Sequence, residues 1–203
     1  MVSVILTLLL FIASASSSWA TTYYVATTGS NSNDGLTEST AKLTINHCVS
    51  IMVAGDTCYV RGGTYTESGG VQFARSGTAS GPIKLLNYPG ESPIISFPSH
   101  TVSNRILLQH SSGINVAMGY ISIEGFEITG GWEGIKAYSL HNSVIRRNWI
   151  HDGFGQGVLG NGGHHNTIER NIINHQGDFA TCAATPSTCN QVHGLYLYGQ
   201  SYT

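Results

Sequence analysis

The sequence predicts an all-β protein folded as a parallel β-helix, a solenoid whose N-terminal end is capped by an α-helix. Three observations support this prediction. Short Ile-rich segments recur at steps of 22 and 23 residues, a period typical of solenoid coils. The chain contains 25 Gly and is only 10% charged, against roughly 25% in an average soluble domain, so tight corners are frequent. One amphipathic helical segment lies near the start of the chain.

The composition limits the classes of partner. The 203 residues, of which 41% are hydrophobic, can bury the core of one domain, which argues against intrinsic disorder. The formal net charge is -2, so the chain offers no basic surface for a phosphate backbone. Nucleic acid is therefore not an expected partner.

Residues 1–20 have the pattern of a secretory signal peptide. The segment Val2–Ala13 is apolar but too short to span a bilayer core of about 30 Å, and Ser18 and Ala20 supply small residues at the two positions that determine cleavage after Ala20. We expect a secreted protein, located in the extracellular space, on the cell surface or in the periplasm, with no membrane contact after cleavage. A short membrane anchor and a misassigned start are the alternatives. Residues 21–203 then form the β-helix domain, with an N-terminal cap at 21–65 and coils at 66–203.

The expected cap contains two short strands and a loop. The first strand is predicted at Tyr23–Val25 and the second at Thr57–Val60, where apolar and polar residues alternate. Between them, residues 29–35 are rich in Gly, Asn, Ser and Asp, a composition typical of a loop.

A helix is predicted at Ala41–Val53. Apolar residues recur there at helical spacing on one face, Thr40 precedes the segment as an N-cap, and Gly55 lies just after its end. This helix is suited to covering the first coil of the solenoid.

Four cysteines in a secreted chain predict two disulfides. Local spacing favours Cys48 with Cys58, which would join the helix to the second strand, and Cys182 with Cys189, which would close a loop. Free buried thiols are the alternative. The cysteine spacing matches no zinc site, so a structural metal is not expected.

The second half of the chain contains the repeat. It aligns three segments, Ile123–Ile128, Ile145–Ile150 and Ile168–Ile173. The same shift places Gly134 over Gly157, and the pattern returns at Gly194 after an insertion that contains the second cysteine pair. Each segment is expected to add one strand to a parallel sheet, at roughly 4.8 Å from the last.

Residue types distinguish the β-helix from other solenoids. The Leu frame of leucine-rich repeats is absent, and the frequency of Gly, Asn and β-branched residues excludes helical repeats. Gly and Asn are expected at left-handed corners. We expect Asn148 and Asn171 to stack at one corner, with Gly125 at the same place one coil earlier, in a structural role.

The two ends of a coil stack are open sheet edges that recruit other strands unless they are covered. No second capping segment follows the alternation at Leu195 and Leu197. We therefore expect the sequence to be an N-terminal fragment of a longer β-helix. A partner chain or stacking between molecules is the alternative cover.

Several segments resemble known proteins. They are Tyr23-Tyr24-Val25 with the loop and helix after it, Ala54-Gly55-Asp56-Thr57-Cys58-Tyr59-Val60-Arg61-Gly62-Gly63-Thr64-Tyr65, Gly81-Pro82-Ile83, and Tyr88-Pro89-Gly90-Glu91-Ser92-Pro93-Ile94-Ile95. Together they resemble the opening of secreted right-handed parallel β-helix proteins of the pectin-lyase-like superfamily, including polysaccharide lyases of the chondroitinase B and alginate lyase type. The resemblance implies a right-handed winding and a polysaccharide bound along the flank of the coils. The same fold hosts hydrolases, epimerases and noncatalytic adhesins.

Strand alternation predicts which residues line that flank. If Ile135, Val158 and Leu195 point inward, their neighbours point outward in three files. The files are Glu133, Gln156 and His193; Lys136, Leu159 and Tyr196; and Tyr138, Asn161 and Tyr198. Aromatic rings beside amides and charges are typical of sugar-binding surfaces. We assign substrate contacts to five residues, Glu133, Tyr138, Gln156, Asn161 and Tyr198. Ordinary exposed strand residues are the alternative explanation.

A lyase acting on a uronate must neutralise the substrate carboxylate, remove the C5 proton and assist the departing oxygen. The candidate bases are Lys136 and His193, and the candidate acid is Tyr196. Candidate partners for the substrate carboxylate are Arg146, Arg147 and Arg170. Ca²⁺ is a candidate cofactor, since Glu133, Asp152 and Asp178 offer carboxylate oxygens, with turn capping as the alternative role.

Two functions therefore remain open. The first is a secreted lyase that cleaves an acidic polysaccharide by β-elimination. The second is a noncatalytic β-helix module that binds a glycan or serves as an adhesin or surface scaffold. A positive groove would favour an acidic substrate, and the net charge of -2 gives this little support.

Overall fold

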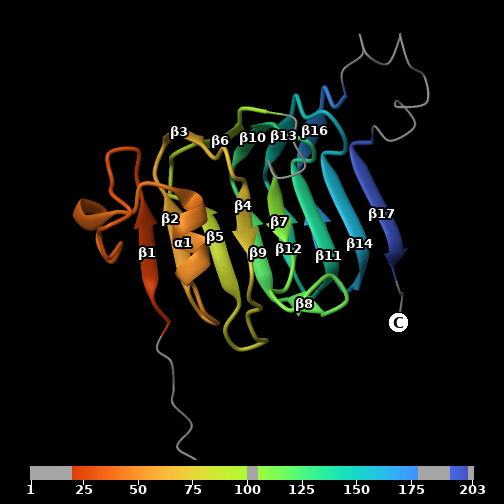
Figure 1. The fold of residues 1–203 in the computed structure, drawn as a ribbon, viewed down its shortest axis with the longest axis horizontal. Helices are drawn as coiled ribbons and strands as arrows, with labels where there is room; N and C mark the ends of the chain where they lie inside the picture. Colours follow the sequence, from red (N-terminus) through yellow and green to blue (C-terminus); the bar gives the residue numbers. More distant parts are fainter. Residues whose placement is uncertain (1–19, 100–104, 178–192, 201–203) are drawn as a thin grey trace, which may run out of the picture.

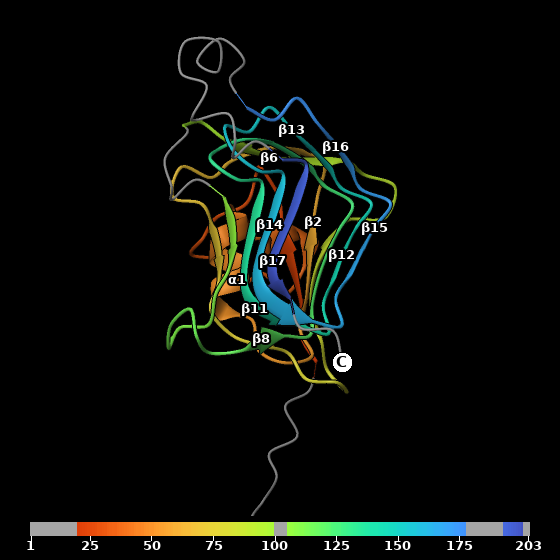
Figure 2. The same cartoon turned by 90° about the vertical axis from the view of Figure 1, so that its right-hand side faces the viewer.

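The computed structural model describes residues 20–99, 105–177 and 193–200. Over these residues the chain winds into a parallel β-helix, in which successive coils add strands to three sheets (Figure 1). Seen from the β17 end, the sheets form the sides of one tube (Figure 2). The predicted all-β class with an N-terminal helix is confirmed.

The three sheets are named A, B and C, and their strands pair in parallel. Sheet A consists of β1 (Thr22–Val25), β2 (Thr57–Val60), β5 (Ile83–Asn87), β9 (Ile121–Glu124), β12 (Val144–Arg146) and β15 (Thr167–Glu169). Sheet B consists of β3 (Gly63–Thr66), β6 (Pro93–Phe97), β10 (Glu127–Gly130), β13 (Trp149–His151) and β16 (Ile172–Asn174). Sheet C consists of β4 (Val71–Phe73), β7 (Ile106–Leu108), β11 (Ile135–His141), β14 (Val158–His164) and β17 (Leu195–Gln200), with β8 (Met118–Gly119) paired to β11.

The repeat corresponds to one interior column. Ile145 of β12 pairs with Ile123 on one side and with Ile168 on the other, as the alignment predicts. Leu85 of β5 extends the column one coil earlier. Ile123 and Leu85 are fully buried, and burying such a side chain contributes about 1.5–3 kcal/mol, so stacked apolar columns are the main source of stability.

The corner between sheets A and B uses a left-handed residue in each of three coils. Gly125, Arg147 and Arg170 have φ of 82°, 56° and 55° there. The expectation of a left-handed Gly or Asn is therefore confirmed at Gly125 but wrong in the next two coils, where the arginine before each asparagine takes this conformation. The reason is that an arginine can accept the backbone strain when the residues around it are held by hydrogen bonds.

Those hydrogen bonds come from an asparagine ladder at the next position. The backbone N and the Nδ2 of Asn148 donate to Oδ1 of Asn171, which confirms the predicted stacking. Asn148 Oδ1 accepts from the backbone N of Phe126. Phe126, rather than Gly125, is thus the partner of Asn148 one coil earlier, and the predicted place of Gly125 is wrong by one residue.

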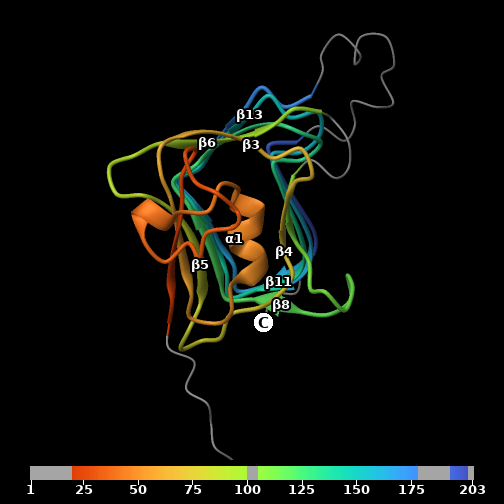
Figure 3. The same ribbon diagram turned by 60° about the vertical axis from the view of Figure 1, so that its left-hand side comes forward.

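The N-terminal cap holds a 3-10 helix, η1 (Glu38–Thr40), and the helix α1 (Ile45–Ile51). Figure 3 shows α1 across the N-terminal end of the coil stack, and it packs against β1, β2 and β4. It is shorter than the predicted Ala41–Val53. The reason is that Lys42 forms a parallel bridge with Val25, which keeps the chain extended before the helix.

The start of α1 is set by two side chains. The hydroxyl of Thr44 accepts from the backbone N of His47, so Thr44 is the N-cap and the prediction of Thr40 is wrong. The buried carboxylate of Glu67 accepts from the backbone N of Ile45 at 2.6 Å. Burial raises the pKa of Glu67, and the hydrogen bonds that its carboxylate accepts from the backbone of the helix partly offset this rise.

The disulfide between Cys48 and Cys58 is confirmed and joins α1 to β2. The second predicted pair, Cys182 and Cys189, and residues 1–19 of the predicted signal peptide lie outside the described residues. Within the described ranges, no helix has the length and apolar character needed to cross a membrane.

Candidate active site

The register of sheet C confirms two of the three predicted files. Ile135, Val158 and Leu195 pair in one row across β11, β14 and β17. The next rows are Lys136, Leu159 and Tyr196, followed two residues on by Tyr138, Asn161 and Tyr198. Side chains of one row therefore repeat along the coil axis at the spacing of the strands, about 4.8 Å.

A cleft of about 320 Å³ opens where the chain leaves sheet B and enters sheet C. It is lined by Trp132, Glu133, Lys136, Gln156, Leu159, His193 and Tyr196. The three candidate catalytic residues, Lys136, His193 and Tyr196, therefore share one cleft, together with two of the predicted substrate contacts.

Glu133 forms the floor of this cleft and is only 1% exposed. Its carboxylate lies 2.9 Å from Nζ of Lys136 and also pairs with Arg105 from one coil earlier. A buried carboxylate requires such partners, because an unpaired charge in the interior is strongly disfavoured. Glu133 thus fixes the position of Lys136.

Gln156 is also buried, with 8% exposure. Glu133 and Gln156 thus line the cleft as buried side chains rather than as the exposed strand residues of the predicted file. Both residues lie in turns before β11 and β14, which begin at Ile135 and Val158, and strand alternation does not extend into those turns.

His193 and Tyr196 form the exposed rim of the cleft. Their rings stack with centroids 5.1 Å apart and an interplanar angle of 13°. On β11, which is separated from β17 by β14, Lys136 Nζ lies 5.5 Å from the ring centroid of Tyr138, within reach of a cation–π interaction. The cleft thus combines an ammonium, an imidazole and a phenol.

Tyr138, Asn161 and Tyr198 do not line the cleft but continue along the same outer face of sheet C. The side chain of Tyr198 is 60% exposed. The row forms a strip beside the cleft on which a long polymer could lie, so the predicted substrate contacts of these three residues stay a prediction.

The candidate arginines lie elsewhere, at the corner between sheets A and B. Arg146 Nε and an amino group of Arg147 lie 2.8 Å and 2.9 Å from Oε2 of Glu124. Burial raises the pKa of Glu124, but the hydrogen bonds from Ser122 and Arg146 and the charges of both arginines outweigh it, so the pKa lies below its usual value. Arg146 and Arg147 therefore do not serve the cleft of sheet C.

The described carboxylates do not fit a calcium site. Glu133 is already paired with two cations, and Oδ2 of Asp152 lies 2.7 Å from Nδ1 of His151. Asp178 lies outside the described residues. In the part of the chain that the structure describes, no three His, Cys, Asp or Glu side chains gather so that they could hold a metal ion.

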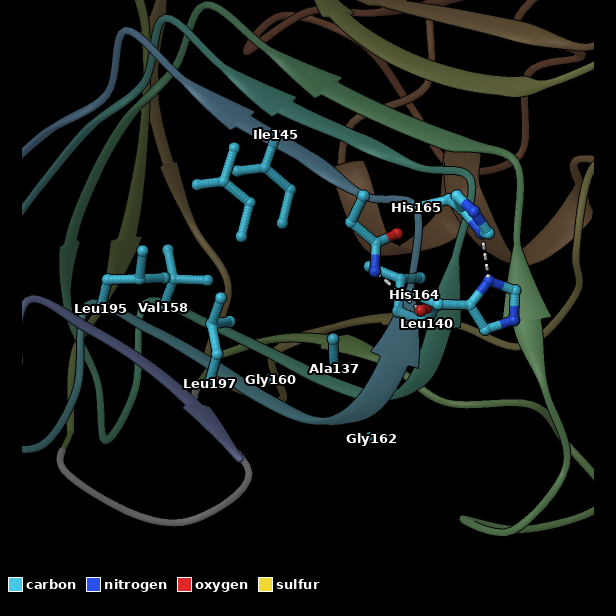
Figure 4. Close-up of a pocket in the computed structure, with 12 residues that line it drawn as sticks. Ala137, Leu140, Ile145, Val158, Gly160, Gly162, His164, His165, Leu195 and Leu197 are labelled. Carbon is cyan, nitrogen blue, oxygen red and sulfur yellow. Dashed lines mark hydrogen bonds between the residues drawn. The ribbon is translucent and has the colours of Figure 1, made fainter. Parts of the chain in front are cut away.

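A second, apolar cavity lies inside the tube at the β17 end. Figure 4 shows Ile145, Val158, Leu195 and Leu197 pointing into it, with His164 and His165 at one side. These aliphatic residues belong to the interior face of the coils. The cavity is therefore the cross-section of the core rather than a site for polar chemistry.

Sequence reasoning missed Trp132 and Arg105. Trp132 lines the cleft and packs against Phe154, with ring centroids 4.7 Å apart. Arg105 directly precedes Ile106, which pairs with Ile135 of β11. Extending the repeat one coil toward the N-terminus would have placed this cation near Glu133.

Comparisons with known proteins agree with this architecture. A family model described as "Pel9A-like, right handed beta helix region" matches residues 23–185, which confirms the right-handed parallel β-helix. The chain is 43% identical over 72 residues to pectate lyase PEL9 of Emericella nidulans, covering 36% of this chain and 17% of that protein. It is 25% identical over 153 residues to pectate lyase L of Dickeya dadantii, covering 72% of this chain and 35% of that protein.

Among solved structures, the crystal structure of pectate lyase Pel9A matches with a TM-score of 0.60 and 21% identity, over 74% of this chain and 38% of that chain. This likeness concerns the fold. The chain spans 17% and 35% of the lengths of the two curated relatives.

Proposed function

The chain belongs to the Pel9A-like right-handed β-helix family, and on this premise we propose that it is a polysaccharide lyase that cleaves a uronate polymer by β-elimination. The two curated relatives are pectate lyases by name, which makes polygalacturonate the first substrate to test. The reaction is assigned to the cleft at the start of sheet C.

One observation carries this proposal. Lys136, His193 and Tyr196, which come from two strands and a turn, line the same cleft. β-Elimination needs a cation for the substrate carboxylate, a base for the C5 proton and an acid for the departing oxygen, and these side chains supply one of each.

The roles follow from the contacts of each group. Lys136, paired with Glu133 at 2.9 Å, offers an ammonium to the substrate carboxylate and so stabilises the charge that develops as the C5 proton leaves. Glu133 is then a positioning residue rather than a substrate contact. His193 serves as the base, and Lys136 is not needed in that role.

In the proposed reaction His193 takes the C5 proton, and the electron pair of that bond forms the double bond between C4 and C5. The bond from C4 to the glycosidic oxygen breaks at the same time. The hydroxyl of Tyr196, whose ring stacks on His193, donates a proton to this oxygen. The products are an unsaturated uronate at one new end and a hydroxyl at the other.

The test is to incubate the protein with polygalacturonate, alginate and chondroitin and to follow the ultraviolet absorbance of the unsaturated product. Absorbance that grows with one polymer supports the lyase and identifies its substrate. Binding to a polymer without any absorbance would instead support the noncatalytic glycan-binding module.

Secretion is a further part of the proposal, because the pattern of residues 1–20 is that of a signal peptide. Expression of the full chain in a secreting host tests it. An N-terminus at Thr21 in the exported protein supports cleavage after Ala20, and retention of the complete chain inside the cell contradicts it.

A further inference from the structure

We propose that the outer face of sheet A carries a second glycan-binding site, a notch that takes one uronate residue and is separate from the cleft. The notch has a volume of about 510 Å³. It is lined by Tyr59, Leu86, Asn87, Pro89, Gly90, Gly125 and Arg147. The sugar class follows from these side chains, and the site does not depend on the proposed lyase activity.

Gly125 leaves room at this corner for the side chain of Asn87. Asn87, Gly125 and Arg147 follow residues that pair in register on β5, β9 and β12, so they occupy one corner in three successive coils. A Cβ on Gly125 would lie 2.0 Å from Oδ1 of Asn87. Because Gly125 has no side chain, the amide of Asn87 lies over this coil, and Arg147 follows one coil later, at a strand spacing of about 4.8 Å.

An aromatic ring forms one wall. Tyr59 packs between Tyr24 and Tyr88, with ring centroids 6.3 Å and 6.2 Å away. These neighbours fix the ring of Tyr59 in place. A fixed aromatic face beside polar groups suits a pyranose ring, whose apolar face stacks on it while the hydroxyls reach the rim.

Two polar groups at the rim match a uronate. Asn87 Nδ2 donates to the carbonyl oxygen of Glu91 at 2.8 Å, which fixes the amide and directs Oδ1 toward Gly125 as an acceptor for a sugar hydroxyl. The side chain of Arg147 is 52% exposed, and one of its amino groups pairs with Glu124. A guanidinium has five N–H donors, so Arg147 can also bind a sugar carboxylate.

The occupant is therefore a sugar with a carboxylate rather than a neutral sugar. The ring of Tyr59 can stack on either kind of sugar, but only the charged sugar gains a charge-assisted hydrogen bond from Arg147. The notch lies on sheet A and the cleft on sheet C, so a polymer held in the notch leaves the cleft open for another segment.

The test is a nuclear magnetic resonance titration of the full ¹⁵N-labelled chain with digalacturonate, and with uncharged digalactose as the matched probe. The amides of Gly90 and Gly125 report on the notch, and those of Gly157 and Gly194 report on the cleft. We expect saturable shifts of Gly90 and Gly125 with digalacturonate, and at least threefold weaker binding of digalactose.

Two variants test whether binding in the notch depends on the charge of Arg147 or only on an intact fold. Arg147→Gln should weaken the notch titration at least threefold and leave the shifts of Gly157 and Gly194 unchanged. Arg170→Gln is the matched control, because Arg170 occupies the same corner one coil later with φ of 55° against 56°. It should leave both titrations unchanged.

If Arg147→Gln does not fold, Tyr59→Leu takes its place, since Leu86 already occupies the paired position on β5. It should also weaken the notch titration at least threefold. The proposal is overturned if Gly90 and Gly125 do not shift, if digalactose binds equally well, or if the variants match wild type. Absence of unsaturated product with intact notch shifts would reject the lyase alone.

Discussion

Asn148 Nδ2 lies 3.1 Å from Oδ1 of Asn171 and 3.1 Å from the carbonyl oxygen of Ile123. One amide side chain therefore joins three successive coils from inside the corner. Such an amide replaces backbone hydrogen bonds that the turn itself cannot make.

Asn148→Ala should lower the free energy of unfolding by about 2–3 kcal/mol, because the carbonyl of Ile123 and the amide of Phe126 would lose buried partners. Urea unfolding followed by circular dichroism measures this loss. The control is Asn174→Ala, which removes only an exposed hydrogen bond from Trp149 Nε1 and should change stability by no more than about 1 kcal/mol. Equal losses in the two variants would contradict a special role of the ladder.

Replacing Cys48 and Cys58 together by alanine should lower the free energy of unfolding by about 2–3 kcal/mol, since the bond closes a short loop in the unfolded chain. Thermal unfolding of the variant and of wild type, without reductant, measures the change. An unchanged midpoint would show that the cap stays in place without the covalent link.

The stability of the protein should fall as the pH drops below about 6.5. Burial lowers the pKa of His141, and the charge of His164, whose ring stacks 5.4 Å away, lowers it further. The unfolded chain, with the ordinary imidazole pKa, then binds the proton first. The contribution of His141 to stability is fully present above that ordinary pKa. It is lost progressively as the pH falls to the lower pKa of the folded state.

His141→Gln should make this pH dependence shallower. Thermal midpoints of the variant and of wild type, measured between about pH 7.5 and pH 5, test it. His175→Gln, at an exposed position, is the control and should keep the wild-type slope. An identical slope in all three proteins would rule out His141 as the source.

Tyr196→Phe should lower kcat about 10²–10³-fold with little change in KM, because the ring still stacks on His193 and only the proton donor is lost. Tyr198→Phe, two residues along the same strand, should change KM alone if Tyr198 only contacts substrate. Rates of unsaturated product formation measure both. A kcat of Tyr196→Phe equal to wild type would exclude the phenol as the acid.

Lyase activity assigned to this cleft should persist in EGTA, since the described carboxylates do not form a calcium site and Lys136 supplies the cation. The measurement is the rate of product formation with EGTA and with added Ca²⁺. Complete loss in EGTA, restored by Ca²⁺, would show that the carboxylate is bound by a metal rather than by Lys136.

The repeat predicts the fold well because the spacing of the repeat along the chain decides which residues of neighbouring coils pair. Once Ile123, Ile145 and Ile168 align, the register of sheet A follows, and the rows of sheet C follow from Ile135 in the same way. The start of the helix could not be predicted from the apolar stripe. The bridge between Lys42 and Val25 overrides local propensity there, and it depends on tertiary contact.

The site was predicted in part for a similar reason. Lys136 and Tyr196 follow from strand alternation, which is local, whereas His193 lies in the turn before β17. The burial of Glu133 depends on Arg105, which comes from another coil, and a pattern in a single strand holds no information on it. The notch at Gly125 was missed because residues of several coils form it.

The corner residues have a further consequence. Eight residues other than glycine have positive φ in the described ranges, among them Tyr120, Arg147 and Asp152. Each left-handed residue costs roughly 1–2 kcal/mol relative to the ordinary conformation, a cost that glycine avoids. The backbone thus carries large side chains at the corners of its coils, at a cost in thermal stability. Replacing these corner residues by glycine one at a time should raise the melting temperature. A replacement that also abolishes an activity would identify a corner side chain that this activity requires.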